Sequence, residues 1–118
     1  MYKLEYEATI NCAHELEKTI SLYSEKCLNL HGHDFRIKIT IEAEKLEDGM
    51  IIDFGILKNI IYEWDHKYLN DFVDNPTAET LSFILHGKIE KELEKRNIVE
   101  TKLKVQVSEN PHASITYW

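Results

Sequence analysis

The strongest constraint on the fold is a strict alternation of apolar and polar side chains from residue 35 to residue 43. Every second position in this segment is apolar, namely Phe35, Ile37, Ile39, Ile41 and Ala43. Successive side chains of a β-strand point to opposite faces, so this period predicts a strand with one buried face and one solvated face. Because the backbone of a strand needs a partner for its hydrogen bonds, the chain must supply further strands.

Three other segments show the same two-residue period and are predicted strands. They are Tyr2 to Ala8, which we expect to continue towards His14, then Leu103 to Val107, and finally Ala113 to Tyr117. Residues 15–30 lack a clean period and are predicted to form a long loop, which in a compact domain is usually functional or mobile. A turn at Glu109 to Pro111 is expected to join the last two strands.

Two helices are predicted between the strand pairs. The first has apolar residues at helical spacing, with Asp53 as its expected N-cap and an end near Asp65 and His66; its apolar face is Leu57, Ile60, Ile61 and Trp64. The second is expected to start at Asn75 and Pro76. Its buried stripe is predicted to be Leu81, Leu85, Ile89 and Leu93, and the charged residues from Glu90 to Arg96 are expected to form a solvated face.

The order ββααββ predicts an α+β fold, with a four-stranded antiparallel sheet and two helices on one face. We expect residues 1–118 to form a single domain. The opposite sheet face and both edge strands would be left uncovered, which predicts a homo-oligomer.

Composition excludes some classes of partner. The formal net charge is −7, which argues against nucleic acid, since phosphate contacts require clustered Lys and Arg. No apolar run is long enough to cross a membrane, and acidic residues interrupt the first segment, so we expect a cytoplasmic protein. The two cysteines, Cys12 and Cys27, are expected to be reduced.

A metal site is predicted just ahead of the clearest strand. His31 and His33 are two residues apart, so on a strand their imidazoles point to the same side, with Gly32 between them. His14, at the end of the first predicted strand, is the best third ligand, and Cys27 lies nearby in the sequence. Three imidazoles around a tetrahedral zinc ion leave one position open, which is typical of catalytic sites.

Six motifs in order resemble the 6-pyruvoyltetrahydropterin synthase family. They are His14; Cys27 with His31 and His33; Gly49 to Phe54; Asp65 to Asn70; Asn75 to Glu79; and Val107 to Glu109. The spacing of three residues between Cys27 and His31 is most similar to the 6-carboxytetrahydropterin synthase branch.

The resemblance implies a tunnelling fold in which trimers close a barrel and two trimers stack into a hexamer. It implies a zinc-dependent lyase that converts 7,8-dihydroneopterin triphosphate to 6-carboxytetrahydropterin, acetaldehyde and triphosphate, in the biosynthesis of queuosine and other 7-deazapurines. Carried over by position, His14, His31 and His33 would bind Zn²⁺. Cys27, Asp65 and His66 would be catalytic, and the Glu109 carboxylate would accept hydrogen bonds from the pterin.

Other interpretations stay open at this point. The same fold could make pyruvoyltetrahydropterin or a folate-pathway pterin, or it could be a zinc-stabilised scaffold without chemistry. Cys12 is expected to be a small buried residue, and His86 and His112 ordinary surface residues. Asp53, Thr77 and Glu79 could serve only helix starts, and nothing in the sequence selects among three candidate lysines for the triphosphate, Lys18, Lys26 and Lys67.

Overall fold

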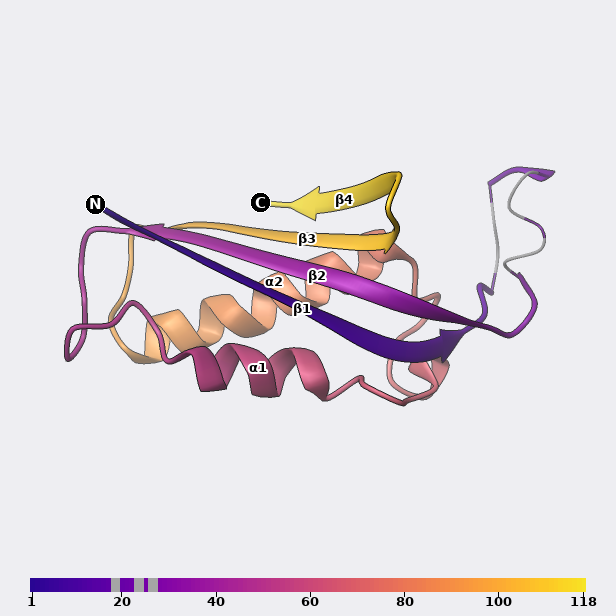
Figure 1. The fold of residues 1–118 in the computed structure, drawn as a ribbon, viewed down its shortest axis with the longest axis horizontal. Coiled ribbons are helices and arrows are strands. Elements are labelled where there is room, and N and C mark those ends of the chain that lie inside the picture. Colours follow the sequence, from indigo (N-terminus) through magenta and orange to yellow (C-terminus); the bar gives the residue numbers. More distant parts are fainter. Residues whose placement is uncertain (18–19, 23–24, 26–27) are drawn as a thin grey trace.

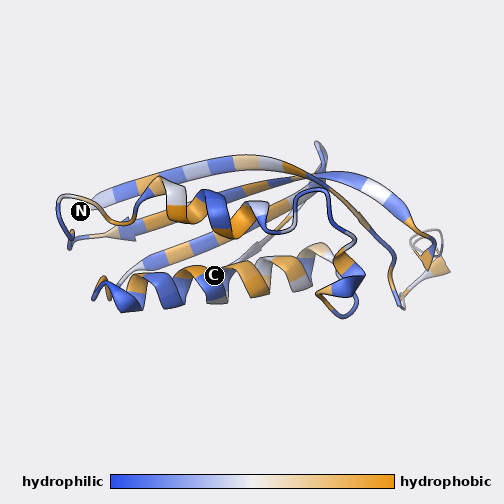
Figure 2. Cartoon of the chain, turned by 90° about the horizontal axis from the view of Figure 1, so that it is seen from below, coloured by the Kyte–Doolittle hydropathy of each residue, from blue (hydrophilic) through white to orange (hydrophobic). Residues whose placement is uncertain are grey.

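Two helices cover one face of a four-stranded sheet, as the sequence predicts. The computed structural model describes residues 1–17, 20–22, 25 and 28–118. The sheet is antiparallel with the strand order β1-β2-β3-β4 (Figure 1). Seen along the sheet, both helices lie on the same side of it (Figure 2). The predicted α+β class and ββααββ order are therefore confirmed.

The two longest strands form the frame on which the site is built. β1 (Tyr2–His14) and β2 (His31–Ala43) pair over their whole length, and their last pairs include Cys12 with His33 and His14 with His31. The five apolar positions predicted to be buried on β2, from Phe35 to Ala43, are at most 1% exposed. Both strands continue beyond the clear alternation, because the metal-ligand motif itself is part of the ladder.

The remaining strands complete the sheet on the other side of β2. β3 (Lys102–Asn110) pairs with β2, and β4 (Ala113–Tyr117) pairs with β3. The register of the β3–β4 pair shifts between Ser108 and Asn110, which is typical of a β-bulge. Glu109 lies at this irregularity.

Side-chain caps define where the helices begin. α1 (Phe54–Tyr62) starts after Asp53, whose carboxylate accepts a hydrogen bond from the Gly55 amide at 2.8 Å, as predicted. α2 (Ala78–Lys95) starts after Thr77, whose hydroxyl accepts from the Thr80 amide at 3.1 Å.

Two of the predicted helix boundaries, the end of α1 and the start of α2, are displaced by a few residues. α1 ends at Tyr62 rather than near Asp65 and His66, because the chain turns there towards β1. The prediction that Asn75 and Pro76 open the second helix is also wrong by two residues. Pro76 precedes the Thr77 cap, and its carbonyl lies within hydrogen-bond distance of the His14 ring.

The core lies between the sheet and the helices. The predicted stripe of α2, Leu81, Leu85, Ile89 and Leu93, is at most 1% exposed, and so are Leu57 and Ile61 of α1. Burial of each such side chain contributes about 1.5–3 kcal/mol. Between the helices a short 3-10 helix, η2 (Leu69–Asp71), is anchored by Leu69, which is completely buried.

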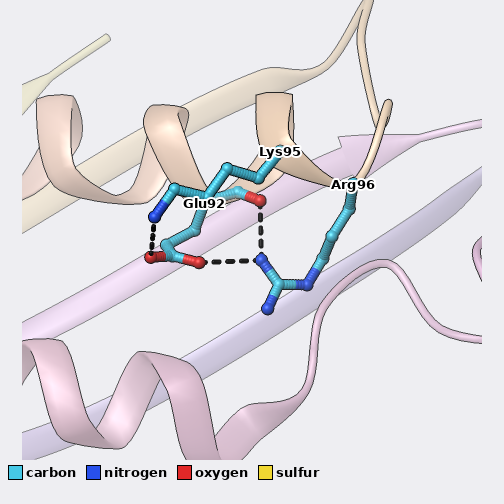
Figure 3. A network of polar contacts seen from close by, with 3 residues as sticks. All are labelled: Glu92, Lys95 and Arg96. Atoms are coloured by element: carbon cyan, nitrogen blue, oxygen red, sulfur yellow. Dashed lines mark hydrogen bonds and ion pairs between the residues drawn. The ribbon is translucent and has the colours of Figure 1, made fainter.

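The charged residues at the end of α2 stabilise the helix itself. Glu92 accepts hydrogen bonds from Lys95 and Arg96, and Arg96 also donates to the Glu92 carbonyl (Figure 3). The bond from Arg96, followed by that from Lys95, lowers the pKa of Glu92. Within the described residues, neither helix combines the length and apolar character that crossing a bilayer would require.

Of the two histidines expected at the surface, only His112 is exposed. The His86 side chain is 13% exposed and lies 3.6 Å from the Glu90 carboxylate. Its ring also packs edge-on against Tyr117 of β4, at 4.8 Å between centroids. The expectation for His86 is therefore wrong, because β4 folds over this part of α2, which the helical pattern alone does not reveal.

Candidate functional site

Three histidine rings meet at the end of the β1–β2 ladder. The ring centroids of His14 and His31 are 4.4 Å apart, those of His31 and His33 4.6 Å, and those of His14 and His33 5.0 Å. One nitrogen from each ring can be chosen so that all three lie within 4.8 Å of one another. The buried ring of Phe35 packs against the rings of His14 and His33, with 5.3 Å between ring centroids in each pair.

Two of the rings are held by backbone carbonyls. The Nδ1 atom of His14 lies 2.7 Å from the Pro76 carbonyl, and that of His31 lies 2.7 Å from the Asn29 carbonyl. A carbonyl can only accept, so each Nδ1 carries the hydrogen and each Nε2 presents a lone pair. Both Nε2 atoms are buried, and neither has a hydrogen-bond partner among the residues that the structure describes. A buried acceptor without a partner is costly, which indicates that it binds something else.

The surroundings of His14 and His33 favour the neutral form of both imidazoles. Burial is the main cause that lowers the pKa of His14 and of His33 below the usual value of 6.5. The neighbouring histidines lower it further, whereas Glu109 raises it in both cases. Because only neutral imidazole binds a metal, the shifts favour the ligating form.

The site therefore fits a divalent metal ion. Zinc–nitrogen bonds are about 2.0–2.1 Å long, so zinc needs its ligand nitrogens close together, as one nitrogen from each of these rings can be. The NH groups held by carbonyls are the usual outer partners of metal-binding histidines. The prediction that His14, His31 and His33 converge is confirmed, whereas the identity of the metal stays a prediction.

Asp65 and His66 form a second pair beside the outer edge of β1. One carboxylate oxygen of Asp65 accepts from the Asn11 amide at 2.9 Å, and the other lies 2.9 Å from Nδ1 of His66. The Asn11 bond is the main cause that lowers the pKa of Asp65, with His66 adding to it. His66 has a φ of 59°, and its side chain is 77% exposed. Asp65 thus both docks on β1 and orients an accessible imidazole.

A hollow of about 880 Å³ connects several of the predicted residues. His33, His66 and Glu109 all contribute to its lining. Glu109 is half-buried in the bulged part of β3. The size lies within the range of small-molecule sites. The structure thus places a metal-site histidine, the imidazole of the second pair and the predicted pterin-binding carboxylate around one space.

Some residues that line this hollow could not be assigned to a site from the sequence. Arg36 lines it from the outward face of β2, and Lys67 follows His66. Arg36 is one of the polar positions of the alternating segment 35–43, and nothing in such a pattern marks it as part of a site. Of the lysines considered for the triphosphate, Lys67 is at the hollow, and Lys18 and Lys26 lie outside the described residues.

Of the two cysteines, only Cys12 lies among the described residues. Cys12 is buried, and burial is the main cause that raises the pKa of its thiol to about 12, so it is a packing residue as predicted. Cys27, the predicted catalytic thiol, lies outside the described residues.

Comparison with protein families gives one match over nearly the whole chain. Residues 3–118 match the family model described as 6-pyruvoyl tetrahydropterin synthase. Solved structures support the same fold. A 6-pyruvoyl tetrahydropterin synthase from Caenorhabditis elegans superposes with a TM-score of 0.72 at 23% identity, covering 98% of this chain and 94% of that one. An uncharacterized protein from Wolinella succinogenes reaches 0.74 at 16% identity, covering 99% and 97%.

Curated relatives carry two kinds of name. A 6-carboxy-5,6,7,8-tetrahydropterin synthase from Synechocystis is 31% identical, over 77% of each chain. A putative enzyme of the same name from Archaeoglobus fulgidus is 32% identical, over 77% of this chain and 79% of its own. A dihydroneopterin monophosphate aldolase from Pyrococcus furiosus is also 32% identical, over 77% of each chain.

Proposed function

This chain belongs to the 6-pyruvoyl tetrahydropterin synthase family, and on that premise we propose that it is a zinc-dependent 6-carboxytetrahydropterin synthase. The substrate would be 7,8-dihydroneopterin triphosphate, and the products 6-carboxytetrahydropterin, acetaldehyde and triphosphate, on the route to queuosine and other 7-deazapurines. The observation that carries the proposal is the set of three converging histidines, two of whose Nε2 atoms lack a hydrogen-bond partner within the described part of the chain. The names of relatives from Synechocystis and Archaeoglobus support the choice of product.

His14, His31 and His33 would hold the zinc ion. Bound there, zinc would act as a Lewis acid that stabilises negative charge developing on the substrate side chain, and as a template that orients it. The Nδ1 hydrogen bonds of His14 and His31 fix both rings with their Nε2 atoms available. The fully buried ring of Phe35 packs against the rings of His14 and His33.

Proton transfer would be the task of Cys27, Asp65 and His66. The reaction needs protons to leave side-chain carbons and return to the ring, so it needs acids and bases close to the substrate. Asp65 binds the Nδ1 side of His66, which leaves Nε2 of His66 to exchange a proton. The Cys27 thiolate would be the second base, since a nearby cation makes a thiol easier to ionise.

Glu109 would bind the pterin ring. A pterin presents a ring NH and an amino group side by side, and one carboxylate can accept from both. The position of Glu109 at the hollow, near enough to His14 and His33 to raise their pKa, supports this role.

Glu109→Gln should weaken substrate binding while zinc content stays the same. Hydrogen bonds to a charged group are worth about 1.5–3 kcal/mol, so we expect KM to rise about 10- to 100-fold. Steady-state kinetics measures this, with the exposed helix residue Glu94 changed to Gln as a matched control. An unchanged KM in Glu109→Gln would remove Glu109 from the pterin site.

Association of copies of this chain is part of the proposal. The strands at the two sheet edges are β1 and β4. In the described part of the chain, no strand pairs with the outer edge of β1 from Tyr2 to Ile10. Such an edge readily pairs with another copy, and we propose a hexamer built as a dimer of trimers. Sedimentation equilibrium measures it, and a stable monomer at micromolar concentration would contradict it.

The Pyrococcus relative supports a second candidate, an aldolase acting on dihydroneopterin monophosphate. The deciding experiment is to incubate the purified zinc-loaded protein separately with dihydroneopterin triphosphate and monophosphate, and to identify the products by mass. We expect 6-carboxytetrahydropterin and acetaldehyde from the triphosphate. Cleavage of the monophosphate alone would favour the aldolase. If neither substrate reacts and zinc removal unfolds the protein, the non-catalytic scaffold is the better interpretation.

A further inference from the structure

We infer that Asn70 is a positioning residue for the metal ligand His14. The inference rests on the proposed metal centre and concerns how that centre is held in place. His14 is the last residue of β1, and its ladder partner is His31, the first residue of β2. The backbone that follows His14 has therefore left the sheet and needs other partners.

Asn70 provides hydrogen-bond partners for both backbone groups of Glu15, the residue that follows His14. Its side-chain oxygen accepts from the Glu15 amide at 2.9 Å, and its side-chain nitrogen donates to the Glu15 carbonyl at 2.7 Å. A side-chain amide has one acceptor and one donor in a fixed plane, so it replaces the backbone of a neighbouring strand at this point. The contact joins residues 55 positions apart, and it lies directly beside His14.

The bond between Asn70 and Glu15 is one of a series along the edge of β1. The His66 amide donates to the Asn11 carbonyl at 2.6 Å, and the Ala13 amide donates to the Lys67 carbonyl at 3.0 Å. Further along, the Glu17 amide donates to the side-chain oxygen of Asn75 at 2.9 Å. Residues 65–75 thus follow the edge of β1 from Asn11 past His14.

The same segment also holds the His14 ring. Asn75 has a φ of 44°, a conformation that Asn tolerates better than most residues, and the buried Pro76 that follows accepts from Nδ1 of His14. His14 is therefore fixed at its ring by Pro76 and at its following peptide by Asn70. Leu69, fully buried in η2, fixes the turn from which Asn70 projects.

Tyr68 adds a third contact to Glu15. Its hydroxyl donates to the Glu15 carboxylate, and this bond is the main cause that raises the pKa of Tyr68 to about 12. Within the described residues, the side-chain hydrogen bonds of Asn70 go to the backbone of Glu15, so we infer that its effect on the metal acts through that backbone.

Asn70→Ala should raise the dissociation constant for Zn²⁺ about 10- to 100-fold, the range seen when outer partners of metal ligands are removed. The measurement is competition with a chromophoric chelator on the full chain, together with the absorption spectrum of the Co²⁺-loaded protein. Asn59→Ala is the matched control, because Asn59 is exposed on α1 and far from the cluster in sequence. Ile89→Val, a change in the core of α2, controls for a general loss of stability.

The expected result is weaker zinc binding and an altered Co²⁺ spectrum in Asn70→Ala, with both properties unchanged in the two controls. If Asn70→Ala does not fold, Asn70→Asp takes its place, since it keeps the acceptor for the Glu15 amide and replaces the donor to the Glu15 carbonyl by a negatively charged oxygen. Zinc binding within twofold of the wild type in a folded Asn70 variant would overturn this inference alone. A wild-type chain that binds no zinc would overturn the proposed metal centre as well.

Discussion

Replacing His31 by alanine is expected to abolish stoichiometric zinc binding and, with it, turnover. Two imidazoles would remain, and a two-ligand site is too weak to keep zinc against dialysis. Because removing an outer partner alone costs 10- to 100-fold in affinity, we expect the loss of a direct ligand to exceed about 100-fold. Metal content per chain after dialysis, together with turnover of dihydroneopterin triphosphate, measures the effect.

His112→Ala is the matched control for this experiment. His112 lies exposed in the turn between β3 and β4, so its loss should leave zinc content and turnover unchanged. His31→Ala should still fold, because the His31 ring packs at the end of the ladder rather than in the main core. Full zinc content and full activity in His31→Ala would show that the three histidines do not form the metal centre.

His66→Asn should reduce kcat about 100- to 10,000-fold, the range typical of losing a general acid or base. Asparagine is the suitable replacement because His66 has a φ of 59°, which Asn tolerates, so the backbone should keep its bond to Asn11. Zinc content and melting temperature should be unchanged, since His66 is neither a metal ligand nor buried.

His112→Asn is the control for the His66 variant, as it makes the same chemical change at an exposed position. A kcat within twofold of the wild type in His66→Asn would exclude His66 from proton transfer. A loss of zinc in the same variant would instead indicate that residues 65–75 had moved away from β1.

The sheet and the convergence of the histidines could be predicted because both depend on local periodicity. A two-residue period places His31 and His33 on one side whatever the rest of the chain does. The pairing of His14 with His31 required one further assumption, that the first two predicted strands form a hairpin, and the register confirms it.

The role of residues 65–75 could not be predicted, because it depends on contacts between distant parts of the chain. The motifs around Asp65, Asn70 and Asn75 were visible, but each of these side chains binds a backbone amide more than 50 residues away. A side chain that takes the place of a neighbouring strand as a hydrogen-bond partner produces no periodic pattern in the sequence. The same contacts explain why Pro76 does not begin α2, since its carbonyl is committed to His14.

The way residues 65–75 follow β1 limits how this chain can change in length. Asp65, Asn70 and Asn75 meet the amides of Asn11, Glu15 and Glu17 in turn. Inserting or deleting one residue between Asp65 and Asn70 would change the spacing between these two side chains. Asp65 and Asn70 could then no longer both reach the amides of Asn11 and Glu15. Insertions should therefore accumulate on either side of this stretch and not within it, so its spacing is as informative about the site as its residue types.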